Sequence, residues 1–131
     1  MQNLTFGGCF NQPVENLPQY LQNLTFGYCF NKSVDNLPHS LQNLTFGIKF
    51  NQTLDNLPNH ILIINFINNY DLQCEFNKEL NYLPNSILEI RLPENYDKKL
   101  INIPINLKKI YCSPSYKFTY KYNNIDIVSP V

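Results

Sequence analysis

A 20-residue unit repeats along this chain of 131 residues. The segment 21–40, LQNLTFGYCFNKSVDNLPHS, is followed directly by the segment 41–60, LQNLTFGIKFNQTLDNLPNH, and residues 1–20 are the same unit with Met1 in the leading Leu position. One unit of this length cannot bury its apolar side alone, so short units of this kind stack against one another in a solenoid. The sequence therefore predicts a stacked fold in which each unit forms one rung.

The period continues after the near-identical copies end. Six extra residues within the segment 67–75 lengthen the fourth unit, and the final unit loses its Leu-Pro step. We therefore expect a single repeat domain over residues 1–131, a loop at the extra residues, and a degenerate last rung that caps the stack. The expected rungs cover about residues 1–20, 21–40, 41–60, 61–86, 87–106 and 107–131.

Each rung contains a short segment of alternating polarity, such as Leu24-Thr25-Phe26. Leu and Phe should face inward and Thr outward, and strands one repeat apart should pair in parallel. The Leu-Pro step of the return segment disfavours helix. The predicted fold is a β-rich, right-handed stack of about six rungs. One short strand per rung lies on the concave face, the convex side is extended or 3₁₀, and α-helix is scarce. A glycine follows the strand in the first three rungs, where a side chain would interfere (Gly7, Gly27 and Gly47).

An aromatic residue followed by asparagine recurs at one position of the first four rungs. The rings should stack as a spine with centroids about 4.5–7 Å apart, and Tyr96 and Tyr116 continue the spine without the asparagine. The asparagine side chains should face inward, buried, and bond to the backbone of the turn and of the next rung. These structural positions are Phe10, Asn11, Phe30, Asn31, Phe50, Asn51, Phe76 and Asn77.

The pattern LPxxLxxLxFxxxFNxxVxxLP is similar to the leucine-rich repeat, in the short variant with a Leu-Pro step before each strand. More specifically, LTFGxxFNxxVxNLPxxL resembles the FNIP repeat of social amoebae and giant viruses over about residues 1–110. The resemblance implies a leucine-rich-repeat-like solenoid with a protein-binding role. Family members often join these repeats to an N-terminal F-box and are taken to present substrates to a ubiquitin ligase. Because Met1 already lies within a rung, we expect a chain without that F-box.

Composition and missing motifs narrow the classes of function. Ten acidic residues balance ten basic ones, which argues against whole-molecule attraction to nucleic acid or anionic lipid. No apolar run approaches the ~20 residues that span a bilayer, and no signal peptide is visible. We therefore expect a cytoplasmic protein, in the host cytoplasm if it is viral. No phosphate-binding loop, carboxylate pair or activated nucleophile is recognisable, so we predict no enzyme, no cofactor and no small-molecule ligand.

Two of the four cysteines, Cys9 and Cys29, occupy the same repeat position. Adjacent rungs should stack them about 5 Å apart, which makes a disulfide sterically conceivable, but a cytosolic setting favours free thiols. The cysteines and histidines lack the spacing of a zinc site. We therefore predict no metal.

The expected concave face changes in character along the stack. The first three rungs present only Asn and Thr, whereas the last three diversify, and Arg and Tyr are enriched at interface hot spots. The predicted function is a non-enzymatic protein-interaction module that binds a protein partner through the concave strand face. The alternatives are a truncated repeat remnant without a partner, or the substrate-recognition part of a ubiquitin-ligase adaptor. The candidate partner-binding residues are Asn65, Glu89, Arg91, Lys109 and Tyr111.

The segment 116–122, YKFTYKY, interleaves aromatic residues with lysines. Lysine on an edge strand prevents further pairing, so we expect this segment to be the edge strand that closes the stack. Stacking on the bases of single-stranded nucleic acid is the alternative for such a pattern.

Overall fold

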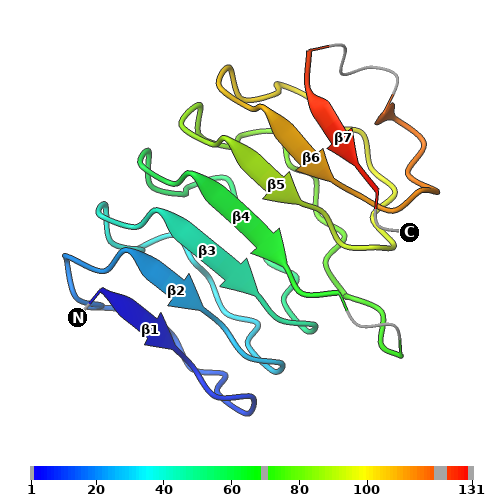
Figure 1. Cartoon of the computed structure of the whole chain (residues 1–131). Coiled ribbons are helices and arrows are strands. Elements are labelled where there is room, and N and C mark those ends of the chain that lie inside the picture. The colour runs from blue at the N-terminus through cyan, green and yellow to red at the C-terminus, as the bar shows by residue number, and fades with distance from the viewer. Residues whose placement is uncertain (1, 69–70, 120–123, 130–131) are drawn as a thin grey trace.

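A computed structural model describes residues 2–68, 71–119 and 124–129 of the chain. Seven strands form one sheet in chain order, every neighbouring pair is parallel, and the chain returns behind the sheet between strands (Figure 1). No α-helix occurs within the described residues. The predicted solenoid is therefore confirmed, with one strand more than the six rungs expected. The strands are β1 (Asn3–Thr5), β2 (Asn23–Thr25), β3 (Asn43–Phe46), β4 (Ile63–Phe66), β5 (Glu89–Arg91), β6 (Lys109–Tyr111) and β7 (Asp126–Val128).

Equivalent residues of successive rungs lie opposite each other. Leu24 pairs with Leu4 and Leu44, and Ile64 pairs with Ile90 although 26 residues separate them. The register survives the longer fourth rung because the extra residues leave the sheet after β4 ends. The second residue of each strand from β2 to β6 is buried, and the first and third residues face away from the core. We call the surface made by the first and third residues of the strands the strand face.

Two columns of aromatic rings run through the core. Phe26, directly after β2, stacks on Phe30 of the same rung with ring centroids 3.7 Å apart. Each ring also stacks on its equivalent in the next rung, Phe26 on Phe46 at 5.9 Å and Phe30 on Phe50 at 6.1 Å. All four are fully buried. The spine expected from the sequence is thus one of two columns, and the ring contact within each of the first four rungs was not foreseen.

The asparagines that follow the second column form a ladder between rungs, but they are not buried. Asn31 and Asn51 are half-buried, and Asn11 and Asn77 are exposed, so the predicted burial is wrong. The Oδ1 atoms of Asn11, Asn31 and Asn51 each accept a hydrogen bond from the backbone N–H of the equivalent asparagine in the next rung. The three distances are 2.8, 2.9 and 3.1 Å. In extended backbone adjacent side chains point to opposite sides, so the inward ring turns the following asparagine toward the surface.

Contact between neighbouring rungs requires glycine at two positions of the stack. A Cβ built on Gly27 would lie 2.4 Å from the carbonyl oxygen of Gly7, and one on Gly47 would lie 2.2 Å from that of Gly27. No glycine has a positive φ, so contact between rungs, and not backbone conformation, excludes a side chain at Gly27 and Gly47. At Gly7, the first of the column, nothing lies within 4 Å of the added atom.

The return segments are turns and irregular backbone. The N–H three residues after each proline of the Leu-Pro or Ile-Pro step donates to the proline carbonyl, as from Leu41 to Pro38 at 3.2 Å and from Leu107 to Pro104 at 3.1 Å. This turn delivers the chain to the next strand.

The C-terminal end differs from the prediction. The edge strand is β7, in which Ile127 pairs with Ile110, whereas Tyr116 lies in irregular backbone and residues 117 and 118 lie in a turn. The ring of Tyr116 instead continues the aromatic column at 6.3 Å from Tyr96. The sixth rung therefore first completes its return segment. The chain reaches the sheet again only at β7, which pairs with β6 and becomes the edge strand. The remainder of the expected strand, Tyr120 to Tyr122, and Met1 of the first rung lie outside the described residues.

Candidate functional site

The N-terminal half of the strand face is a ladder of asparagine amides. The Nδ2 of Asn23 donates to the Oδ1 of Asn3 at 2.5 Å, and the Nδ2 of Asn43 donates to the Oδ1 of Asn23. The ladder ends at β4, where Ile63 takes the equivalent place. Because the amides bond to one another, this half of the face is largely satisfied by its own side chains.

The C-terminal half brings the candidate residues into two rows across β4, β5 and β6. Asn65 pairs with Arg91, which pairs with Tyr111, and these three make one row. Glu89 and Lys109 pair in the other row. All five are half-buried. The sequence-predicted candidates are therefore neighbours in space, although 46 positions separate the first from the last.

An arginine stacked on a tyrosine dominates the first row. The guanidinium carbon of Arg91 lies 4.4 Å from the centroid of the Tyr111 ring, and the Nζ of Lys109 lies 5.7 Å from the same centroid. Arg91 forms no ion pair with any residue that the structure describes. The Oδ1 of Asn65 is buried and has no hydrogen-bond partner within the same residues. The row thus combines an aromatic face with polar groups that none of the described residues satisfies.

A pocket of about 360 Å³ opens at the end of this row. Asn65, Arg91 and Tyr111 line it, whereas Glu89 and Lys109 do not. The other lining residues come from the last residue of β4 and from the segments that follow β4, β5 and β6, and sequence reasoning missed them because they share no repeat position with the candidates. They are Phe66, Ile67, Asn68, Leu92, Glu94, Cys112 and Ser113.

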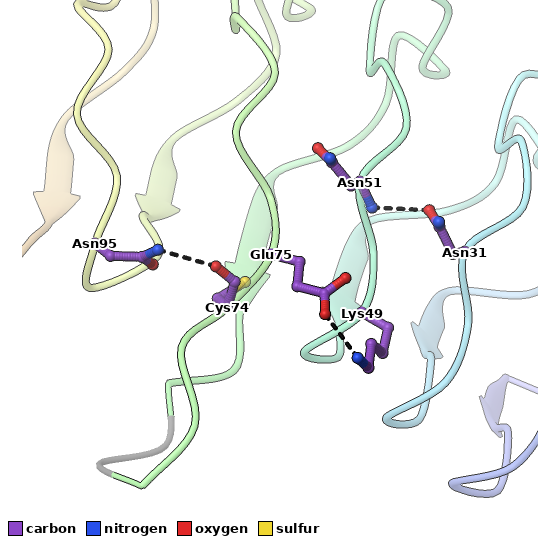
Figure 2. Close-up of polar contacts among 6 residues, drawn as sticks. All are labelled: Asn31, Lys49, Asn51, Cys74, Glu75 and Asn95. Carbon is purple, nitrogen blue, oxygen red and sulfur yellow. Dashed lines mark hydrogen bonds and ion pairs between the residues drawn. The ribbon is translucent and has the colours of Figure 1, made fainter.

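The insertion after β4 forms one wall of this pocket and is tied to the next rung. The Nδ2 of Asn68 donates to the carbonyl of Leu92 at 3.2 Å, and its Oδ1 accepts from the N–H of Glu94 at 2.8 Å. Further along, the Nδ2 of Asn95 donates to the carbonyl of Cys74 at 3.1 Å (Figure 2). A second hollow of about 370 Å³ shares Asn68, Glu94 and Ser113 with the first. The described part of the insertion, through Asn68, Leu72 and Cys74, thus walls two adjoining hollows.

An ion pair links the C-terminal end of the insertion to the third rung. The Nζ of Lys49 lies 2.7 Å from the Oε1 of Glu75 (Figure 2). The hydrogen bond and the charge of Glu75 raise the pKa of Lys49 above its usual value. Both side chains are exposed, so water and salt screen the pair, and its contribution to stability is small.

The four cysteines are free thiols. Cys74 and Cys112 are buried, and burial raises the pKa of both thiols. Across the part of the chain that the structure describes, no three His, Cys, Asp or Glu side chains gather in a group that could hold a metal ion. In the same part, no helix has the length and apolar character to cross a membrane.

Comparison with known proteins agrees with the geometry. Residues 10–49 match the family model of the FNIP Repeat. The chain is also similar to the crystal structure of CroV588 from the giant virus CroV, described as a novel circular leucine-rich-repeat protein. The identity is 34%, the TM-score is 0.74, and the match covers 86% of this chain. The chain spans 17% of the length of CroV588. No curated protein matches it.

Solenoids of this type are typically interaction modules without catalytic activity, because stacked rungs offer an extended surface and no enclosed site. The resemblance to the FNIP repeat, drawn from LTFGxxFNxxVxNLPxxL, is confirmed over the matched residues. Residues 10–49 therefore match the FNIP repeat, and the described chain forms a leucine-rich-repeat-like solenoid.

Proposed function

We propose that the chain is a non-enzymatic protein-interaction module that binds its partner through the strand face of β4, β5 and β6 and the adjoining pocket. The stacked pair of Arg91 and Tyr111 at the mouth of the pocket is the observation that carries this proposal. Arginine and tyrosine, together with tryptophan, are enriched among the side chains that dominate binding energy at interfaces.

The difference between the two halves of the strand face supports this position. The amides of Asn3, Asn23 and Asn43 bond to one another, so a partner would have to replace bonds that already exist. Arg91 carries a charge without a described counter-ion, and Ile67, beside the pocket, is 41% exposed. A partner segment that offers an acceptor and an apolar side chain would therefore gain contacts at this end of the face without breaking the ladder.

Affinity capture with the purified chain as bait, from cells that make it naturally, tests the proposal. Arg91→Ala and Tyr111→Ala should each weaken recovery of the partner, and a hot-spot loss of about 2 kcal/mol corresponds to roughly 30-fold in affinity. Thr25→Ala, on the other half of the strand face, is the matched control and should recover the partner normally. Circular dichroism should be the same for all three variants.

Equal recovery of the same partner by Arg91→Ala and Tyr111→Ala would refute binding at this surface. Loss of the partner in Thr25→Ala as well would place the contact across the whole strand face. If the chain is instead a repeat remnant without a partner, size-exclusion chromatography with light scattering should show aggregation. A thermal melt of the same protein should then show no cooperative transition. A stable monomer would argue against that alternative.

A further inference from the structure

One position of the rung, directly before the second aromatic column, forms a column of its own along the side of the stack. Its members in the first four rungs are Cys9, Cys29, Lys49 and Glu75. The backbone N–H of each later member donates to the carbonyl of the residue before the preceding member, at 2.8, 3.0 and 2.8 Å in chain order. The three steps of this column therefore share one backbone geometry.

Side chains at neighbouring positions of the column come into contact. At the third step, the Nζ of Lys49 lies 2.7 Å from the Oε1 of Glu75 (Figure 2). Cys9 and Cys29 occupy the first step, and the rings that follow them stack with an interplanar angle of 9°, so equivalent side chains here point the same way. Paired backbones lie about 5 Å apart, a Cα separation that a disulfide can span. The fold thus holds two thiols side by side.

These two thiols reach water, whereas the other two cysteines do not. Cys9 is exposed and Cys29 is half-buried. Because Cys29 has a rung on either side and still reaches water, the column opens to solvent between rungs. Cys74 and Cys112 are buried, and burial raises the pKa of both thiols, which disfavours the thiolate form that reacts. Thiol chemistry of the folded chain therefore falls on the pair in the column.

We propose that Cys9 and Cys29 form a dithiol site that exchanges with low-molecular-weight disulfides, such as oxidised glutathione, and closes into a disulfide between the first two rungs. The thiolate of one cysteine attacks a sulfur of the small disulfide and expels one small thiolate, which leaves a mixed disulfide on the protein. The thiolate of the other cysteine then attacks the protein sulfur of that bond and expels the second small thiolate. The protein thiols lose two electrons and two protons, and the small disulfide gains them as two thiols.

The closed form links two rungs through a reversible covalent bond. It cross-links the chain across one repeat and so removes conformational freedom from the unfolded chain. The exposed ion pair of Lys49 and Glu75 joins two later rungs in the same column, but water and salt screen it. The stability of the stack should therefore follow the balance of thiols and disulfides around it.

Mass spectrometry of the reduced full chain after incubation with oxidised glutathione at about pH 8 tests the exchange. The closed disulfide should dominate, and little glutathione should stay on the protein. No Lys or Arg lies between Cys9 and Cys29, whereas Tyr20 does. Cleavage by chymotrypsin after Tyr20 therefore yields two peptides that only this disulfide joins. Cys9→Ser and Cys29→Ser are the matched controls, and each should retain one glutathione on the cysteine that remains.

Two further measurements show whether the fold prepares the pair. In concentrated urea, the preference for this disulfide over those with Cys74 or Cys112 should fall by roughly tenfold. The melting temperature of the oxidised chain should exceed that of the reduced chain by about 5 °C or more. Dithiothreitol should abolish the rise, and Cys29→Ser carrying glutathione should show none. A mixed disulfide or disulfide-linked dimers on the unsubstituted chain, the same pairing preference in urea, or a closed form that melts no higher would each overturn the proposal.

Discussion

Replacing Asn31 with alanine removes an acceptor that joins the second rung to the third. Its Oδ1 receives hydrogen bonds from the backbone N–H of Asn51 at 2.9 Å and from the Nε2 of Gln52 at 3.0 Å. One hydrogen bond contributes about 0.5–1.5 kcal/mol net. The half-buried amide of Gln52 can rotate and donate its hydrogen bond to water, whereas the backbone holds the Asn51 N–H in place. We therefore expect the free energy of unfolding to fall by about 1–2 kcal/mol.

Urea denaturation followed by circular dichroism measures this loss. With an m-value of about 2 kcal/mol/M, the midpoint should fall by roughly 0.5–1 M. Asn31→Asp keeps a side-chain oxygen in place and should retain most of the stability. Thr25→Ala, on the strand face and outside the ladder, should change stability by less than about 0.5 kcal/mol. If Asn31→Ala behaves like Thr25→Ala, or Asn31→Asp is as damaging as Asn31→Ala, the ladder does not stabilise the stack.

Two other outcomes follow from the same structure. Gly47→Ala places a Cβ 2.2 Å from a carbonyl oxygen and should cost about 1–3 kcal/mol in a urea melt; a cost no larger than that of Gly8→Ala would contradict the close packing of the rungs. Because burial raises the pKa of Cys74 and Cys112 and the thiolate is the reactive form, iodoacetamide at about pH 8 should label exposed Cys9 first and those two only after unfolding. Mass spectrometry of timed samples would show rapid labelling of folded Cys74 if this reasoning is wrong.

The predictions that proved wrong depend on contacts between residues that the repeat pattern does not specify. Asn31 was expected inside because its amide bonds to the next rung, but the bond forms at the rim, where the side chain is half-buried. The segment from Tyr116 was expected to be a strand because its aromatic residues and lysines alternate. Its first ring instead fills the core column against Tyr96. The local pattern indicates which residues are polar and which are apolar. The position of a turn in space depends instead on how the chain packs against the neighbouring rung.

The sequence by itself determined the solenoid, the parallel register and the rows of the strand face. Near-identical units at a constant spacing can bury their apolar sides together only by stacking in register, so Leu24 must lie between Leu4 and Leu44. Only the tertiary structure decided that Arg91 stacks on Tyr111 and that the insertion, through Asn68, walls a pocket beside them. The physical reason is that a repeat specifies contacts between equivalent positions. The pocket is made by contacts between residues that are not equivalent, and these depend on how the inserted residues pack against the next rung.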